Sequence, residues 1–272
     1  MRRKLFTFLV AFLATLSGAV WGETIQLNNL NNGAKGTGWE YNNNVLTLAE
    51  NSNGFELTGT NENLRVLITQ SCSVTLNNAV IKYKANRAID NESTFALSND
   101  VNLDLIILGE NEIESLATSL WPGTTRLTGI EVPNGAVLTT NAKSTGLLKV
   151  TGRVAIGTSS AFNSRNSSCG TINIEGGTIE AIGEGISIDF LGIKFHPISV
   201  GGGTLFGTQS GTLNVDNNGV LIAEKPIDIP GITSDYEFSG GIVFNASNEG
   251  YVHGNKEVIL QSPLDLENRK IR

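Results

Sequence analysis

Carboxylate side chains gather in one short stretch of the chain. Asp100, Asp104, Glu110 and Glu112 all fall between residues 100 and 112. Carboxylate oxygens are the ligands that Ca²⁺ prefers, and a polysaccharide lyase needs such a site together with a basic group that removes a proton. These four residues are therefore the candidate metal ligands, for Ca²⁺, and no other cofactor is expected. The alternative is that they point outward from a solvated face and hold no metal.

Aromatic and basic residues indicate a second kind of chemistry, the binding of sugars. Such sites combine an exposed aromatic platform with polar side chains. Trp121, with Arg126 nearby, is the best pair in the sequence, and Tyr83 and Tyr236 come next. The alternative for Trp121 is that its ring packs against the side of the domain. We expect these four residues to be the candidate ligand-binding set.

Motifs for other enzyme classes are missing from the sequence. His196 and His253 stand in Phe-His-Pro and Val-His-Gly, whereas pectin hydrolases carry Gly-His-Gly and Asp clusters. Neither His has the context of a Ser-His-Asp triad. An inverting hydrolase needs two carboxyl groups roughly 6.5 to 9.5 Å apart, which neighbouring strands could still supply. We predict no catalytic residue, and an unrecognised polysaccharide lyase or hydrolase stays open as an alternative.

The two cysteines, Cys72 and Cys169, lack the spacing of metal ligands. A disulfide needs Cα atoms within roughly 7 Å, and residues so far apart in a stacked structure would lie several layers apart. We therefore expect two separate buried thiols, with a disulfide as the alternative.

Short strand patterns that alternate apolar and polar residues recur along most of the chain, separated by Asn- and Gly-rich turns. Examples are Val45–Leu48, Phe55–Thr58, Leu64–Ile68, Val101–Leu108 and Val220–Ile222, with turns at 42–44, 77–78 and 176–177. Two architectures fit: an antiparallel sandwich or barrel, and a solenoid of stacked coils. The shortness of the strands and the recurring glycine corners favour an all-β, right-handed parallel β-helix.

A coil of roughly 20 to 25 residues gives on the order of ten coils. A solenoid must cover its end coils. Residues 23–44 are the expected N-terminal cap of a single domain over residues 23–272, and the charged tail 264–272 could cover the other end. Residues 112–126 and 184–197 interrupt the rhythm and are expected to be insertions.

The N-terminal segment, up to Gly22, has the layout of a secretory signal peptide. Arg2, Arg3 and Lys4 precede an apolar run over residues 5–16, and small residues allow cleavage before Glu23. The run is too short for a membrane anchor, which needs roughly 20 residues. We expect an exported product in the periplasm, at the cell surface or outside the cell, with no transmembrane segment in the mature chain.

Composition excludes one class of partner. The net charge is −7 and no basic cluster is present, so nucleic-acid binding, which needs Lys and Arg against phosphates, is not expected.

Several of these segments, in their order along the chain, resemble a family of exported β-helical proteins of gut Bacteroidetes. The opening WEYNNNVLTL at 39–48 is followed by FELTG at 55–59, LIILGENEI at 105–113, GIEVPNGAVL at 129–138 and the glycine-rich CGTINIEGGTIEAIG at 169–183. The resemblance covers most of residues 37–223. The repeated Gly-Ile-Gly-Gly corners of that family are replaced here by Ala-Ile-Gly-Thr at 155–158 and Val-Gly-Gly-Gly at 200–203. The resemblance implies a carbohydrate-binding or adhesin-like role.

Three functions follow in order of expectation. The first is a non-catalytic protein that presents a long parallel-sheet face to a polysaccharide or a cell-surface glycan. The second is a structural or adhesin-like rod. The third is the unrecognised polysaccharide enzyme named above.

Overall fold

The computed structural model describes residues 22–85, 93–117, 128–159, 169–184, 188–190, 193–195, 198–203, 211–215, 218–223, 227–228 and 241–244. These residues form an all-β structure in which most neighbouring strands are parallel. One short 3-10 turn, η1 (Leu27–Asn29), is the only helical element among them. Within this part of the chain, no helix is long and apolar enough to cross a membrane.

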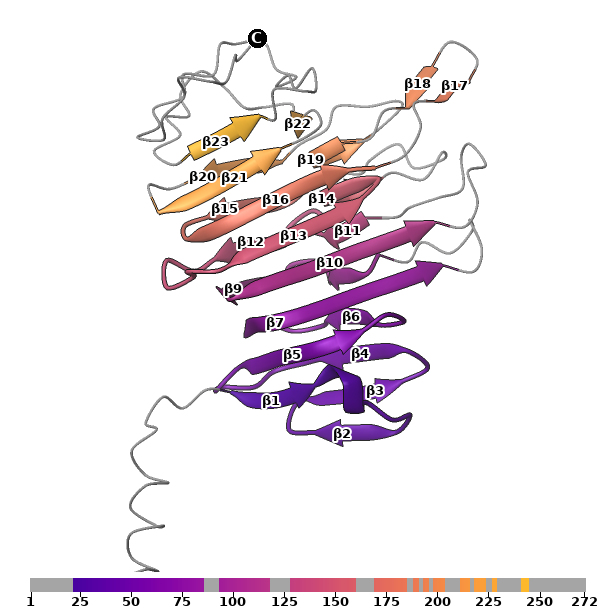
Figure 1. Ribbon diagram of the computed structural model, residues 1–272, viewed down its shortest axis with the longest axis vertical. Coiled ribbons are helices and arrows are strands. Elements are labelled where there is room, and N and C mark those ends of the chain that lie inside the picture. Colours follow the sequence, from indigo (N-terminus) through magenta and orange to yellow (C-terminus); the bar gives the residue numbers. More distant parts are fainter. Residues whose placement is uncertain are drawn as a thin grey trace, which may run out of the picture.

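Two large sheets run along the length of the molecule (Figure 1). The 12-stranded sheet contains β1 (Glu23–Gln26), β5 (Phe55–Asn61), β7 (Cys72–Ala85), β9 (Asn102–Leu108), β10 (Glu110–Ala117), β12 (Val137–Thr140), β13 (Leu147–Gly152), β15 (Thr171–Ile174), β16 (Gly177–Gly183), β20 (Thr212–Val215), β21 (Gly219–Ala223) and β23 (Gly241–Phe244). The nine-stranded sheet contains β2 (Ala34–Gly36), β3 (Trp39–Asn42), β4 (Val45–Leu48), β6 (Arg65–Ile68), β8 (Phe95–Leu97), β11 (Thr128–Glu131), β14 (Val154–Ser159), β19 (Ile198–Gly203) and β22 (Ile227–Asp228).

The long strand β7 divides the 12-stranded sheet into two runs. Residues 72–77 of β7 pair with β9, and β12, β15 and β20 follow in parallel. Residues 80–85 pair with β10, and β13, β16, β21 and β23 follow. From β8 to β22 the chain visits the nine-stranded sheet, then the first run, then the second run, and repeats this circuit (Figure 1). Each circuit adds one level of strands to the stack.

Consecutive levels are further apart in sequence than expected. Leu103 pairs with Leu138 on the next level, and Ile172 pairs with Leu213. The predicted coil length is therefore too short for most of the chain. The described part of the nine-stranded sheet stacks seven parallel strands, from β4 to β22, where roughly ten coils were predicted. The long connections between strands take up the additional residues.

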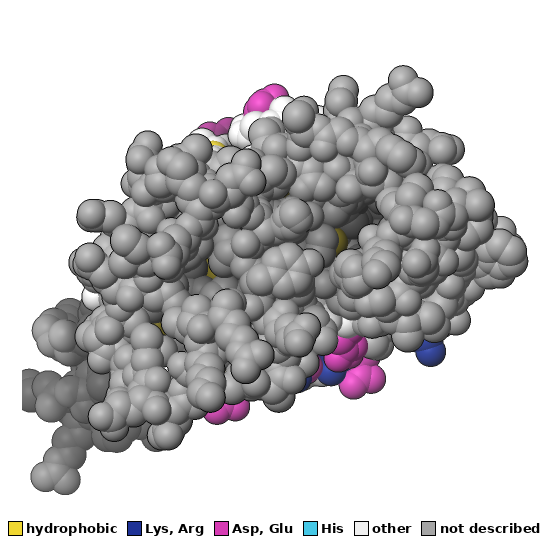
Figure 2. Space-filling view, turned by 90° about the horizontal axis from the view of Figure 1, so that it is seen from above, with side chains coloured by type: hydrophobic (Ala, Val, Ile, Leu, Met, Phe, Trp, Pro, Cys, Tyr) yellow, Lys and Arg dark blue, Asp and Glu magenta, His cyan; other side chains and the backbone are white. Residues whose placement is uncertain are grey.

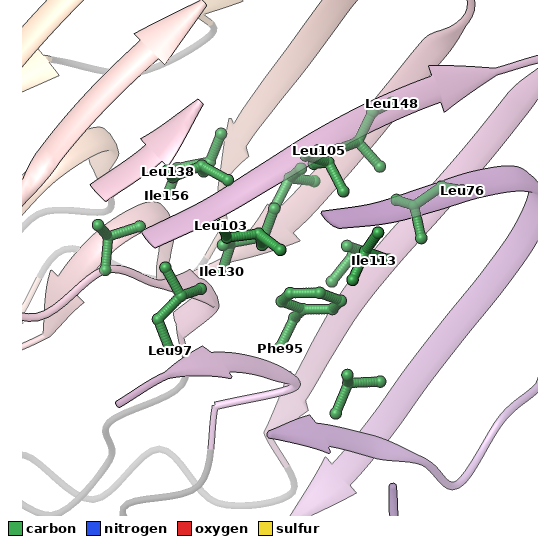
Figure 3. Packing of buried hydrophobic residues seen from close by; sticks show 14 of the residues in the cluster. Leu76, Phe95, Leu97, Leu103, Leu105, Ile113, Ile130, Leu138, Leu148 and Ile156 are labelled. Atoms are coloured by element: carbon green, nitrogen blue, oxygen red, sulfur yellow. The ribbon is translucent and has the colours of Figure 1, made fainter. Parts of the chain in front are cut away.

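Inward side chains at matching register positions form columns between the sheets. Leu46, Val66, Phe95, Ile130 and Ile156 pair in turn across β4, β6, β8, β11 and β14, and each is at most 1% exposed. Figure 3 shows such residues pointing into the space between the strands. Side chains alternate in direction along a strand, so the residues between these inward ones point outward. They too lie at matching positions on successive strands.

The residues predicted to form the N-terminal cap make up the first edge of both sheets. β1 adds to β5 in parallel, whereas β2 and β3 add to β4 as antiparallel strands. The turn between β3 and β4 has Asn43 and Asn44 at positive φ, as a tight two-residue hairpin requires. Trp39 is half-buried and packs against the core. The predicted tail 264–272 lies outside the described residues.

One predicted turn is wrong. Asn77 and Asn78 were expected to separate two strands, but both lie inside β7. Asn78 takes a positive φ of 52°, so a single residue absorbs the bend while strand pairing continues on both sides.

Of the predicted insertions, residues 112–117 belong instead to β10. Residues 188–190 and 193–195 form a separate antiparallel hairpin, β17 (Ile188–Phe190) and β18 (Ile193–Phe195).

Candidate functional site

The outward side chains of the first run of the 12-stranded sheet form a mostly polar surface, which we call the polar face. It consists of eight residues on four consecutive levels: Asn102 and Asp104 on β9, Val137 and Thr139 on β12, Thr171 and Asn173 on β15, and Thr212 and Asn214 on β20. Asn102 is exposed and the other seven are half-buried, as expected for side chains that stand on an open sheet.

Hydrogen bonds join the side chains of successive levels. Asn214 Nδ2 donates to Asn173 Oδ1 at 2.7 Å, and Asn173 Nδ2 donates to Thr139 Oγ1 at 3.1 Å. The donors therefore all point the same way along the stack. Since each amide group carries two N–H donors, Asn173 and Asn214 each keep a second N–H beyond this ladder.

Asp104 forms the lower end of the polar face. Its carboxylate accepts from Asn141 Nδ2 at 3.0 and 3.2 Å and from Ser73 Oγ at 3.5 Å. These contacts fix the carboxylate on the surface by means of neutral donors. Among the eight residues, Asp104 is the only charged one, and none is aromatic or basic.

The four predicted metal ligands are not gathered into one site. Asp100 lies in a turn with φ 60°, Asp104 is held by Asn141, and Glu110 begins β10. Glu112 makes an ion pair with Lys82. No group of three His, Cys, Asp or Glu that could hold a metal ion occurs among the described residues.

The outward face of the second run carries charges of both signs. Lys82 Nζ lies 2.7 Å from Glu114 and 2.9 Å from Glu112. The hydrogen bonds to Glu114 and then Glu112 raise the pKa of Lys82. On the next level, Lys149 is in register with Glu112 and Glu180. The lower edge of Figure 2 is the side of the molecule that faces the viewer in Figure 1, and acidic side chains lie beside basic ones there. This face is a solvated ladder of alternating charge.

Of the predicted ligand-binding residues, the structure describes Tyr83. It is half-buried near the end of β7, and the Arg65 guanidinium lies over its ring, 5.7 Å from the centroid. Arg65 Nε also donates to the backbone oxygen of Ser93 at 3.2 Å, and Ser93 Oγ donates to Glu131. Tyr83 is thus part of a packed corner between the sheets. Trp121, Arg126 and Tyr236 lie outside the described residues, as do His196 and His253.

Both cysteines are free thiols, as expected. Cys169 is buried, whereas Cys72 is only half-buried. Burial raises the pKa of Cys169 to about 12 and that of Cys72 to about 11. Both thiols are therefore protonated near neutral pH and are poor nucleophiles.

Sequence reasoning missed the polar face as a candidate site. Its signal is the repeated pattern Thr-apolar-Asn-apolar in TINI at 171–174 and TLNV at 212–215, which the structure pairs residue by residue. The two segments are further apart in sequence than the spacing expected between coils, so the pattern alone does not place them side by side.

In comparisons with known proteins, no family model, curated protein or solved structure matches the chain.

Proposed function

We propose that the protein is an exported right-handed parallel β-helix that binds a glycan on its polar face without catalysis. The handedness follows from a general rule: parallel strands of one sheet joined by a crossover connect in the right-handed sense in about 98% of cases. The repeated circuit through the nine-stranded sheet and both runs of the 12-stranded sheet corresponds to one coil.

Export is supported by the basic start, the short apolar run and the small residues before Glu23. Glu23 is also the first residue of β1, so removal of residues 1–22 would leave the first strand complete. An exported protein would meet its ligand outside the cytoplasm, so we place the protein at the cell envelope or the cell surface.

The single observation that carries glycan binding is the hydrogen-bonded ladder of Thr139, Asn173 and Asn214. Hydroxyl and amide groups are the partners that sugar hydroxyls use, and here they are already held in place by one another. Preorganised groups lose less conformational entropy when a ligand binds. The ladder therefore offers oriented donors at regular intervals.

The composition of the polar face also supports a role without catalysis. Asp104 is the one carboxylate among its eight residues, whereas glycoside hydrolysis in most families uses a pair of carboxyl groups.

A binding screen tests this proposal. The chain without residues 1–22 is applied to a glycan array beside the double variant Asn173→Ala/Asn214→Ala. Thr178→Ala, on the same level as Asn173 but on β16 of the second run, is the matched control. We expect wild type and control to bind the same glycans and the double variant to lose them. Circular dichroism of all three proteins verifies that they are folded.

Two results would contradict the proposal. If no glycan on the array retains the folded wild-type protein, glycan binding is wrong. If the double variant binds as well as the wild type, the polar face is not the site.

A structural or adhesin-like rod is the second candidate, and one observation favours it. The side chains of the ladder are hydrogen bonded to one another across levels, as are Thr24 and Asn77 with Glu56 on the lower levels. Such contacts stabilise a stack without any ligand. A wild-type protein that binds no glycan but stays folded would support this second role.

A further inference from the structure

We propose that the ligand of the polar face is a neutral, linear glycan that lies parallel to the axis of the stack, with about one sugar unit per level. This inference rests on the proposed function and specifies its ligand. It follows from the direction of the ladder, the composition of the face and the charge at its lower end.

The direction comes from the arrangement of equivalent residues. Asp104, Thr139, Asn173 and Asn214 occupy the same register position on four consecutive parallel strands. The strands β9, β12, β15 and β20 that carry them follow one another along the stack (Figure 1). Neighbouring strands are about 4.8 Å apart, so the column repeats a polar group at about that interval. One ring of an extended 1,4-linked sugar chain has a length comparable with this spacing. A ligand placed along the column can therefore meet a similar group at each step.

A second column widens the surface. Asn102, Val137, Thr171 and Thr212 stand two residues before the members of the first column. Two residues along a strand span roughly 7 Å, about the width of a sugar ring. Thr171 and Thr212 are half-buried on the outward side of their strands, so their hydroxyl groups are placed to bond to a ligand.

None of the eight residues is aromatic, and this determines how the affinity should depend on the number of sugar units in the ligand. Each level offers hydrogen bonds, and a sugar must give up hydrogen bonds to water in order to form them. The binding free energy of a single sugar is therefore small. Once one unit is bound, the next unit of the same chain is held at a high effective concentration over the next level. Affinity should therefore grow with chain length until the levels are filled.

The charge distribution decides the class of glycan. Asp104 places a carboxylate on this face, no Lys or Arg lies among the eight residues, and the whole chain carries a net charge of −7. Like charges placed together disfavour binding. A chain of uronic acids would place carboxylates over Asp104, whereas a neutral chain would not.

Isothermal titration tests the inference. The probes are β-1,4-linked glucose, α-1,4-linked glucose and β-1,4-linked mannose oligosaccharides of two to six units, with oligogalacturonides of the same lengths. We expect at least one neutral series to gain affinity by at least about tenfold between two and four units. The oligogalacturonides should bind more weakly at every length, and Asp104→Asn should reduce that difference.

The outcomes separate this inference from the proposed function. Binding that is lost in Asn173→Ala/Asn214→Ala but does not depend on chain length overturns the axial placement and leaves the polar face as the site. Stronger binding of the oligogalacturonides overturns the neutral class. If neither these probes nor the array gives any binding, the proposed function itself fails.

Discussion

Burial at individual residues has consequences that can be measured. The clearest case is Cys169, whose thiol pKa is raised to about 12 by burial. In the unfolded chain a thiol ionises at about pH 8.5. Between these values the unfolded chain loses a proton that the folded chain keeps. The stabilising contribution is therefore complete below about pH 8.5 and is lost as the pH rises toward the folded-state pKa.

We expect Cys169→Ala to show a smaller fall in unfolding free energy between pH 8 and pH 10 than the wild type, by up to about 2 kcal/mol. Urea denaturation at the two pH values measures this difference. Other groups titrate equally in both proteins, so the comparison isolates the thiol. Equal falls in the two proteins would show that Cys169 is accessible to solvent.

Gly157 illustrates a close approach of two backbones. It lies in β14 in register with Gly201 of β19, its φ is 139°, and a Cβ at this position would come within 1.8 Å of the Gly201 carbonyl oxygen. Neither the dihedral angle nor the space suits a side chain. Gly33 also has a positive φ, but a Cβ there would meet nothing within 4 Å.

The two glycines therefore form a matched pair. We expect Gly157→Ala to lower the unfolding free energy by more than about 3 kcal/mol and Gly33→Ala by about 1 kcal/mol. Thermal or chemical denaturation of both variants tests this. A similar, small loss in both would mean that β14 and β19 can separate to admit a methyl group.

At the scale of elements, one buried amide connects several strands. Asn111 in β10 is 4% exposed. Its Oδ1 accepts from the backbone N–H of Ala79 in β7, and its Nδ2 donates to the carbonyls of Leu108 in β9 and Leu147 in β13. An amide fits here because it offers both a donor and an acceptor. The contacts hold the bend between the two runs at three successive levels.

Replacing this amide by a carboxyl group tests its role. In Asn111→Asp the N–H of Ala79 keeps an acceptor, but an ionised carboxylate would face two carbonyl oxygens, so its pKa should be raised. We expect a loss of about 3 kcal/mol at pH 7 and a smaller loss at pH 4, where the carboxyl group is protonated and can donate.

Asn63→Asp, at an exposed position, is the control and should show little dependence on pH. A loss that is the same at pH 4 and pH 7 in Asn111→Asp would mean that solvent reaches this bend.

At the scale of the whole molecule, the two outward faces of the 12-stranded sheet differ in chemistry. The first run carries neutral amides and hydroxyls above Asp104, whereas the second run alternates Lys82, Glu112, Lys149 and Glu180 from level to level. Lys82 is ion paired with Glu112 and Glu114, and Lys149 is in register with Glu112 and Glu180, so opposite charges are neighbours on the second face. This difference is why we assign the ligand to the first face.

The all-β class and many strand positions were predictable from the sequence. Alternation of apolar and polar residues depends only on local geometry, so segments such as Val45–Leu48 and Val101–Leu108 were recognisable. The free thiols were also predicted correctly. The prediction of a turn at Asn77 and Asn78 was wrong because a strand can contain one residue at positive φ without ending. The residue types alone do not distinguish such a bend from a turn that ends the strand.

The polar face and the separation of the four acidic residues were decided only by the tertiary structure. The ladder depends on which strands become neighbours, and that depends on connections of very different lengths, such as the long one that separates Ile172 from Leu213. Nearness of Asp100, Asp104, Glu110 and Glu112 in sequence did not bring them together, because an extended chain rises about 3.3 Å per residue. The sequence by itself determined which residues face inward and which face outward, since that alternation is local. Which outward residues meet is a non-local property of the stack.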